Sequence, residues 1–180
     1  MLRLRPYKPC DAETIVSWCR DEETFLRWGG DRFGAFPIPG ERMNEKYFRE
    51  NGDCAEADNF YPMTACDGDD VVGHFIIRYL HGDPRILRFG WVIVDDARRG
   101  RRIGQRMLRL GLKAAFEVMQ AEKVTIGVYE DNLPGYRCYL SAGFARCGEQ
   151  PEPAGEKRRI IELALSREDY RAQAEAGGQP

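Results

Sequence analysis

The chain has 180 residues, of which 43% are hydrophobic and 31% are charged, and its net charge at neutral pH is −2. This length and composition are typical of a globular protein with one hydrophobic core. The near-neutral charge argues against a general nucleic-acid-binding protein, because such domains are usually strongly basic. We therefore expect no nucleic-acid partner.

The six cysteines show neither a metal-binding nor a disulfide pattern. No two form a C-x-x-C pair, and neither His74 nor His81 lies close enough to them in sequence to suggest zinc ligands. Unpaired cysteines of this kind are typical of a reducing compartment. The N-terminus lacks the apolar core of a signal peptide, and no apolar run approaches the roughly 18 residues that span a membrane. We expect a soluble cytoplasmic protein without a metal or a membrane partner.

The N-terminal part of the chain predicts a strand followed by helices. Leu2 and Leu4 alternate with arginines, and Pro6 ends this strand. Asp11 is expected to cap a helix that runs through Ile15 and Trp18. A second short helix is expected to carry Phe25, Leu26 and Trp28, a Gly-, Pro- and aromatic-rich loop to cover 29–40, and a third helix to cover about 41–50.

The period then changes to that of strands. Strands are expected at about 61–66, 71–80 and 86–94, with a turn at 67–70. The stretch 103–119 is helical, with its apolar stripe on Ile103, Met107, Leu110, Ala114 and Val118. Further along we expect a strand at 124–129, a short helix after position 134, strands near 144–148 and 158–165, and a polar, disordered tail at 167–180.

This order of elements predicts the fold class. Runs of antiparallel strands beside a single strand–helix–strand unit indicate an α+β domain over residues 1–166, with a mixed, mostly antiparallel central sheet flanked by helices. The chain has no G-x-G-x-x-G after its first strand and no G-K-[ST], which excludes the common dinucleotide and P-loop motifs.

Six arginines lie between positions 98 and 109, where a predicted strand turns into a predicted helix. The first backbone N–H groups of a helix have no partner within the helix, and its dipole adds positive charge there. Arginine side chains suit phosphate oxygens. The join therefore predicts a site for a polyphosphorylated ligand.

Two motifs carry a resemblance to a known family. The join reads R-G-R-R-I-G over Arg99–Gly104, and downstream Asn132 precedes Tyr139, which precedes the pair Gly143-Phe144. At this spacing the chain resembles the GCN5-related N-acetyltransferase (GNAT) superfamily, over about residues 2–165. It departs from the family pattern at Arg102, where the first motif glycine is expected.

The resemblance implies acetyl-CoA as co-substrate, bound through its pyrophosphate at the arginine-rich join and through its pantetheine arm at the preceding strand. Arg106 is expected to reach a phosphate, whereas Arg98 and Arg109 are expected to be solvated. The cofactor-binding residues that it implies are Val92, Ile93, Val94, Arg99, Gly100, Arg101, Arg102, Ile103, Gly104, Gln105 and Asn132.

The implied reaction is direct attack of a primary amine on the acetyl thioester. A backbone N–H near Val92 would stabilise the oxyanion, and Tyr139 matches the family's general acid. The family's usual base positions fall on Gly127 and Arg88, which cannot accept a proton. The alternatives for the base are Glu130, Asp31, Glu41 or a chain of water molecules, while His74 is interpreted as a packed histidine.

The sequence leaves the acceptor open. Trp28, Phe33 and Phe36, with Asp31 nearby, either wall a pocket for a cationic amine or, as we favour, close the core beneath a loop. The acceptor is a small molecule or a protein, and the chain acts as a monomer or a homodimer. The main alternative to an enzyme is a non-catalytic acyl-CoA-binding sensor.

Overall fold

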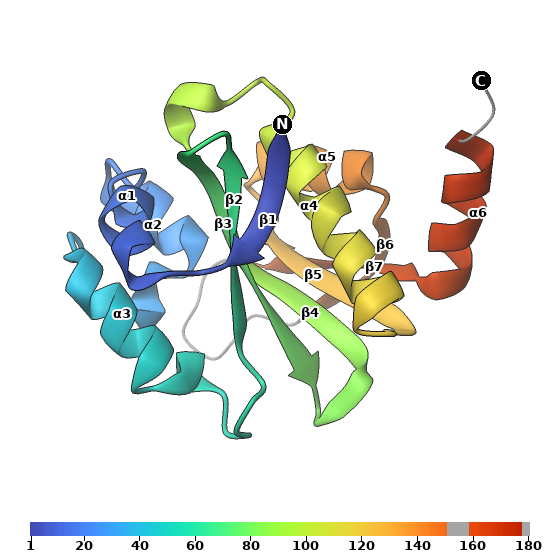
Figure 1. Ribbon diagram of the computed structural model, residues 1–180, viewed down its shortest axis with the longest axis horizontal. Coiled ribbons are helices and arrows are strands. Elements are labelled where there is room, and N and C mark those ends of the chain that lie inside the picture. Colours follow the sequence, from blue (N-terminus) through green and yellow to red (C-terminus); the bar gives the residue numbers. More distant parts are fainter. Residues whose placement is uncertain (151–158, 178–180) are drawn as a thin grey trace. The chain divides into compact units, whose positions relative to one another are not determined.

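The computed structural model describes residues 1–150 and 159–177 (Figure 1). Its seven strands are hydrogen-bonded in the order β1-β2-β3-β4-β5-β7-β6. Neighbours pair antiparallel in β1–β2, β2–β3, β5–β7 and β6–β7, and parallel in β4–β5. This confirms the predicted α+β class with a mostly antiparallel sheet.

The chain divides into two compact units. Unit 1 comprises Met1–Arg78 and Gly90–Met107, and unit 2 comprises Tyr79–Phe89 and Leu108–Pro180. The single domain predicted over 1–166 stays a prediction. None of the helices in the described residues is long and apolar enough to cross a membrane.

Unit 1 contains the strands β1 (Leu2–Pro6) and β2 (Tyr61–Asp67) and all but the last two residues of β3 (Asp70–Leu80). Asp67 pairs with Asp70, so that Gly68 and Asp69 form the predicted hairpin turn. Gly68 has a φ of 65°, the left-handed conformation that such turns require. The strands bury side chains such as those of Val72 and Phe75.

Three helices precede β2 in unit 1, and Figure 1 draws them in blue to cyan: α1 (Ala12–Val16), α2 (Glu22–Trp28) and α3 (Gly40–Phe48). The Asp21 carboxylate caps α2 by accepting the Thr24 N–H at 2.7 Å. Gly29 ends the helix with a φ of 105°. The helices bury an apolar face that forms the core of the unit.

The predicted role of Asp11 is wrong. Its buried carboxylate accepts hydrogen bonds from the Arg5 guanidinium at 2.6 and 2.7 Å, from the Lys8 N–H at 3.0 Å and from the Thr64 hydroxyl at 2.9 Å. Because these partners hold the carboxylate, Asp11 makes no side-chain cap hydrogen bond to α1. Helix α1 also ends at Val16 instead of reaching residue 18. Burial alone would raise the pKa of Asp11, but the hydrogen bonds and the charge of Arg5 hold it below its usual value.

Strand β4 (Asp83–Val94) and helix α4 (Ile103–Lys113) run through both units. The predicted apolar stripe is confirmed at Ile103 and Met107, which are buried. It is wrong at Val118, which is 77% exposed. The helix continues as the π-helix η5 (Ala114–Val118), and the wider π turn rotates the following side chains away from the stripe.

Unit 2 is built on the strands β5 (Lys123–Tyr129), β6 (Ala145–Gln150) and β7 (Ile160–Ser166), with helix α5 (Leu133–Ala142) between β5 and β6. Strands β4 and β5 pair through Ile86–Phe89 and Lys123–Ile126. Position 158, where the last strand was expected to begin, lies outside the described residues. Apolar side chains from β5, β7 and the α4–η5 helix form the core: Val124, Ile126, Leu163, Leu165, Leu112 and Phe116.

The disorder predicted for 167–180 is wrong for most of that segment, because helix α6 (Arg167–Gly177) follows β7 directly. The Tyr170 ring stacks on Phe116 with centroids 4.8 Å apart, and its hydroxyl donates to Glu117 at 2.9 Å. Arg167 donates through Nε to the carbonyl of Ala121 at 2.7 Å. A polar sequence therefore folds here because one aromatic ring and one guanidinium hold it against unit 2. Residues 178–180 lie outside the described part.

Candidate functional site

Hydrogen bonds and ion pairs fix the first residues of the segment that joins β4 to α4 in unit 1. The carboxylate of Asp95 accepts the Ala97 N–H at 3.0 Å. The Arg98 guanidinium bonds Asp70 at 2.5 Å and Asp95 at 3.3 Å. The prediction that Arg98 is simply solvated is therefore wrong. Arg109, in unit 2, was also expected to be solvated, but it donates to the carbonyl of Ser141 at 3.0 Å.

The next four residues, 99–102, form what we call the arginine loop. All four are exposed. Gly100 has a φ of 79° and Arg102 a φ of 57°, so that two left-handed residues bracket Arg101. The Arg102 carbonyl accepts the Arg106 N–H at 3.0 Å and so begins α4. The motif position that carries arginine in place of glycine is thus a position whose backbone conformation favours glycine.

The arginines of this loop have free binding capacity. Within residues 1–150 and 159–177, Arg99, Arg101, Arg102 and Arg106 make no ion pair and no side-chain hydrogen bond. The first turn of α4, from Ile103, adds backbone N–H groups that the helix itself cannot satisfy. Free guanidinium groups beside a helix N-terminus can hold a ligand with several anionic oxygens.

Strand β4 departs from regular geometry shortly before the loop. Trp91 has a φ of 47°, which is rare for a bulky residue and costs free energy. Its carbonyl accepts the Trp28 indole N–H at 2.8 Å, and its ring lies so close to Gly29 that a Cβ there would come within 2.8 Å. The backbone direction of the following residues, Val92–Val94, is therefore fixed by a strained residue that its neighbours hold in place.

The aromatic residues of unit 1 pack on one another. Trp28 and Phe33 are 4% and 1% exposed and stack at 5.0 Å. Phe36 lies 5.5 Å from Phe25 at the margin of the same core. This confirms the favoured interpretation that these residues close the core, and they do not wall an open pocket. The nearby Asp31 is exposed.

His74 is confirmed as a packed histidine. It is fully buried, and its Nε2 lies 2.7 Å from the Tyr47 hydroxyl. Burial lowers the pKa of His74 to about 3, so the ring is neutral at physiological pH. We call the set Trp28, Phe33, Tyr47, Phe60, His74 and Trp91 the aromatic cluster, since its rings contact one another.

In unit 2, helix α5 explains the spacing of the second motif. The Asn132 side chain caps the helix by accepting the Gly135 N–H at 3.0 Å. Gly143 ends it with a φ of 115°, and the Phe144 N–H then bonds the carbonyl of Tyr139 at 3.2 Å. The Phe144 ring packs against Phe89 of β4. The motif therefore specifies one helix of fixed length with Tyr139 on its buried side.

Tyr139 is 7% exposed, and its hydroxyl has no hydrogen-bond partner among the described residues. Burial raises the pKa of Tyr139 above its usual value, the neighbouring Cys138 adds to this, and the positive charge of Arg88 opposes it. The phenol is therefore protonated at neutral pH and has a proton to donate.

At one of the usual base positions, Arg88 forms an ion pair that sequence reasoning missed. Arg88 forms two hydrogen bonds with Glu162 of β7, at 2.7 and 2.8 Å. Gly127 lies beneath the pair, since a Cβ there would come within 2.5 Å of the guanidinium and 3.1 Å of the carboxylate. Glu162 is the single charge of the strand β7, and Arg88 is a charge of opposite sign within the apolar part of β4, which was the available signal.

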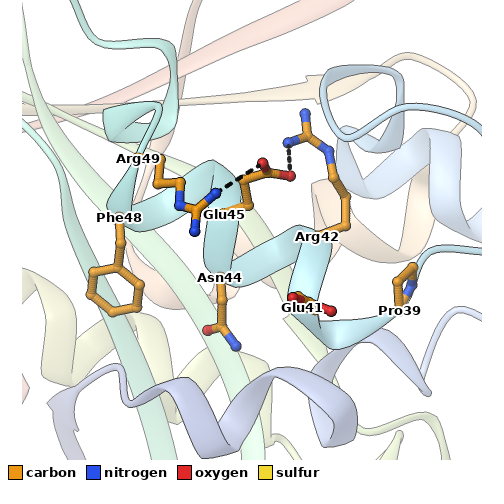
Figure 2. A pocket seen from close by; sticks show the side chains of 7 residues that line it. All are labelled: Pro39, Glu41, Arg42, Asn44, Glu45, Phe48 and Arg49. Carbon is orange, nitrogen blue, oxygen red and sulfur yellow. Dashed lines mark hydrogen bonds and ion pairs between the residues drawn. The ribbon is translucent and has the colours of Figure 1, made fainter.

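The remaining base candidates lie on the surface. Glu130 is exposed and ion-paired with Arg159 at 3.4 Å. Glu41 lines a shallow depression on α3, where Glu45 lies between two arginines that pair with it (Figure 2). The full lining is Pro39, Glu41, Arg42, Asn44, Glu45, Phe48 and Arg49. Among the described residues, no three His, Cys, Asp or Glu side chains gather as metal ligands would.

Comparisons with known proteins agree on one family. The model of the acetyltransferase (GNAT) domain matches residues 1–145. An N-acetyltransferase 9-like protein of Caenorhabditis briggsae is 26% identical over 152 residues, which are 79% of this chain and 74% of that protein.

Solved structures show the same fold at low sequence identity. The aminoglycoside acetyltransferase AAC(6')-Ib in complex with coenzyme A has a TM-score of 0.78 and is 18% identical, over 97% of this chain and 99% of that chain. The spermidine N-acetyltransferase from Vibrio cholerae in complex with CoA and spermine has a TM-score of 0.75 and is 16% identical, over 94% of this chain and 98% of that chain.

Proposed function

Because the chain belongs to the GNAT acetyltransferase family, it is an acetyl-CoA-dependent N-acetyltransferase, and we propose that residues 92–105 bind the acetyl-CoA while Tyr139 protonates the departing thiolate. The observation that carries the cofactor assignment is the set of exposed, unpartnered arginines beside the start of α4. Arg98 and Arg109 are excluded from this set because they already bond other groups.

The pyrophosphate of acetyl-CoA suits the arginine loop. Arg99, Arg101 and Arg102 supply charge, and Gly100 provides the left-handed turn that exposes the loop's backbone. Ile103, Gly104 and Gln105 supply the N–H groups of the first helical turn. Each hydrogen bond to a charged group contributes about 1.5–3 kcal/mol, so a few such contacts suffice for micromolar affinity.

The β4 segment after Trp91 suits the other end of the co-substrate. Registered pairing of β4 with β5 covers Ile86–Phe89, and Val92, Ile93 and Val94 come after it. Their backbone groups are the proposed partners of the pantetheine amides, in the manner of an added strand. A backbone N–H near Val92 is the proposed donor to the oxyanion, and the strained Trp91 fixes its direction.

Asn132 is proposed as a further contact of acetyl-CoA. Its side-chain oxygen is used in capping α5, but its amide N–H₂ has no partner among the described residues. The amide group is thus held by the cap in one orientation and retains two donors. An oriented donor of this kind suits an amide carbonyl or a phosphate oxygen of the co-substrate.

The chemistry requires one proton donor and one proton acceptor. The neutral amine attacks the carbonyl carbon, the C–S bond breaks, and the thiolate takes the proton of Tyr139. Tyr139 can donate because burial keeps its phenol protonated at neutral pH. Since a thiol is the stronger acid of the two, the transfer is completed when the proton lost by the nitrogen returns to the phenolate. The group that receives the acetyl group is a primary amine of a small molecule or of a protein.

The cytoplasm is the compartment that we propose for this reaction, because all six cysteines are free thiols and suit a reducing environment. The expected oligomeric state, a monomer or a homodimer, stays a prediction.

The test is release of CoA thiol from acetyl-CoA in the presence of polyamines, aminoglycosides and peptides with free N-termini, with Tyr139→Phe as the matched variant. We expect turnover with one amine class and a loss of about 100-fold or more in kcat for Tyr139→Phe, because general acid catalysis is removed. Binding of CoA, measured by calorimetry, should change little. Full activity of Tyr139→Phe would contradict the assigned role.

A further inference from the structure

The surroundings of Glu162 are unusual for a carboxylate in a sheet. Its register partner on β5 is Gly127, and its register partner on β6 is Gly148. Among the described residues, no atom lies within 4 Å of where a Cβ at position 148 would be. Both neighbouring strands therefore place a glycine beside Glu162, and the described residues leave space at position 148 on the β6 side.

The charge facing Glu162 comes from one residue of β4. Arg88 bonds both carboxylate oxygens, and the two side chains are only 15% and 12% exposed. Opposite Glu162, β5 and β6 contribute glycines and no charge. The same guanidinium acts on the Tyr139 phenol through its charge. Arg88 thus bonds Glu162 directly and acts on the proposed proton donor through its charge.

The position of this carboxylate coincides with the missing base. Position 127 carries no side chain, and the carboxylate of Glu162 lies 3.1 Å from the point where its Cβ would be. A side chain from β7 thus occupies the place that a carboxylate from β5 would fill. Each carboxylate oxygen has two lone pairs, so the bonds to Arg88 leave each oxygen with capacity for one more donor.

We propose that Glu162, held by Arg88, is the catalytic carboxylate that accepts the proton of the acceptor ammonium. This inference rests on the proposed acetyl transfer. The ammonium N–H bond breaks as an O–H bond forms on Glu162, which passes this proton to water. The neutral amine then attacks, Tyr139 protonates the thiolate, and the second proton of the nitrogen returns to Tyr139 as the amide forms. The lack of a proton acceptor at positions 88 and 127 is therefore no argument for a non-catalytic sensor.

The experiment measures kcat/KM for the best amine acceptor between pH 7 and pH 10 in the wild type and in Glu162→Gln. At pH 7 the variant should lose about 100-fold, as general base catalysis typically contributes 10²–10⁴-fold. The loss should shrink to a few-fold near pH 10, where roughly 30% of an alkyl amine with a pKa of about 10.4 is already neutral. Affinity for CoA should stay within about twofold, since the carboxylate is not assigned to the co-substrate.

Two further variants separate catalysis from structure. Gly127→Glu in the Glu162→Gln background returns a carboxylate to the usual position, at the cost of moving the ends of the Arg88 and Ile160 side chains. It should recover at least about tenfold of the loss. Arg88→Gln removes the guanidinium that orients the Glu162 carboxylate, and it should lower kcat/KM more at pH 7 than near pH 10 if this orientation serves proton transfer.

The outcomes distinguish the two levels of the proposal. If the wild type acetylates no amine, the proposed function fails. If the wild type is active and Glu162→Gln keeps its rate at pH 7, or loses the same factor at every pH, Glu162 is not the proton acceptor. If Glu162→Gln does not fold, the neutral pair Arg88→Gln with Glu162→Gln takes its place, and the same pH dependence decides.

Discussion

The arginine loop and the aromatic cluster both belong to unit 1. In the sequence, the loop was a candidate for binding phosphate, and Trp28 and Phe33 of the cluster were candidates for binding an amine. The loop side chains at 99–102 are exposed, and its arginines have no partner among the described residues. In the aromatic cluster, Trp28 donates to the Trp91 carbonyl and His74 bonds Tyr47, while the rings cover one another. The first region has free guanidinium groups. In the second, the Trp28 indole N–H and the Tyr47 hydroxyl are bonded within the protein, and His74 Nδ1, which has no partner among the described residues, is buried.

This difference shows that residue type alone does not identify a ligand site. Tryptophan and phenylalanine suit a cationic amine, just as arginine suits a phosphate. What separates the regions is whether the polar atoms and faces are already occupied by the protein itself. The three predictions below test that contrast, from the largest expected effect to the smallest.

Gly104→Asp should weaken CoA binding about 100-fold, because a carboxylate in the first turn of α4 would repel the pyrophosphate and cancel the helix dipole. The fold should be unharmed, since an acidic residue stabilises a helix N-terminus. Calorimetry with CoA measures the affinity. Gly104→Ala is the matched control for size, and equal affinities of Gly104→Asp and the wild type would place the phosphates elsewhere.

The aromatic cluster should instead respond to pH through its stability. The pKa of His74 in the folded protein is about 3, below its ordinary 6.5. The unfolded chain therefore binds a proton at this residue below pH 6.5 while the folded protein does not, so the free energy of unfolding is highest above pH 6.5 and decreases as the pH falls below that value. Between pH 7 and pH 5 the loss is about 2 kcal/mol.

Urea unfolding at the two pH values measures this loss in the wild type and in His74→Gln, whose stability should be nearly flat over the interval. His81→Asn serves as the control, since His81 is exposed and Asn tolerates its φ of 55°. A pH slope that persists in His74→Gln would show that the histidine is not held neutral by burial.

Arg102→Gly should raise the free energy of unfolding by less than about 1 kcal/mol. The substitution relieves a left-handed arginine, a strain of roughly 1–2 kcal/mol, but glycine loses more backbone entropy on folding. Thermal unfolding measures the stability, and calorimetry measures CoA affinity on the same samples. A gain in stability together with weaker binding would show that the side chain bonds a phosphate; unchanged affinity would assign Arg102 a backbone role only.

Much of the fold was readable because it depends on local signals. The alternation in β1, the Gly68-Asp69 turn and the Pro134 helix start each act over a few residues. The errors share a different cause. The Asp11 side chain does not cap α1 because it accepts hydrogen bonds from Arg5 and Thr64, which lie outside that helix. The C-terminal segment is ordered because Tyr170 stacks on Phe116, a contact between residues far apart in the sequence that no local pattern predicts.

The sequence by itself determined the family, the arginine loop and the position of Tyr139, because each depends on residues that are close together along the chain. Only the tertiary structure decided which arginines are free and that the aromatic cluster is closed. It also decided that Glu162 lies over Gly127, since that placement depends on the register of β5 with β7 and on an ion pair from β4. Pairing between distant strands is set by the packing of the whole sheet, and a one-residue shift of register would move Glu162 to the opposite face.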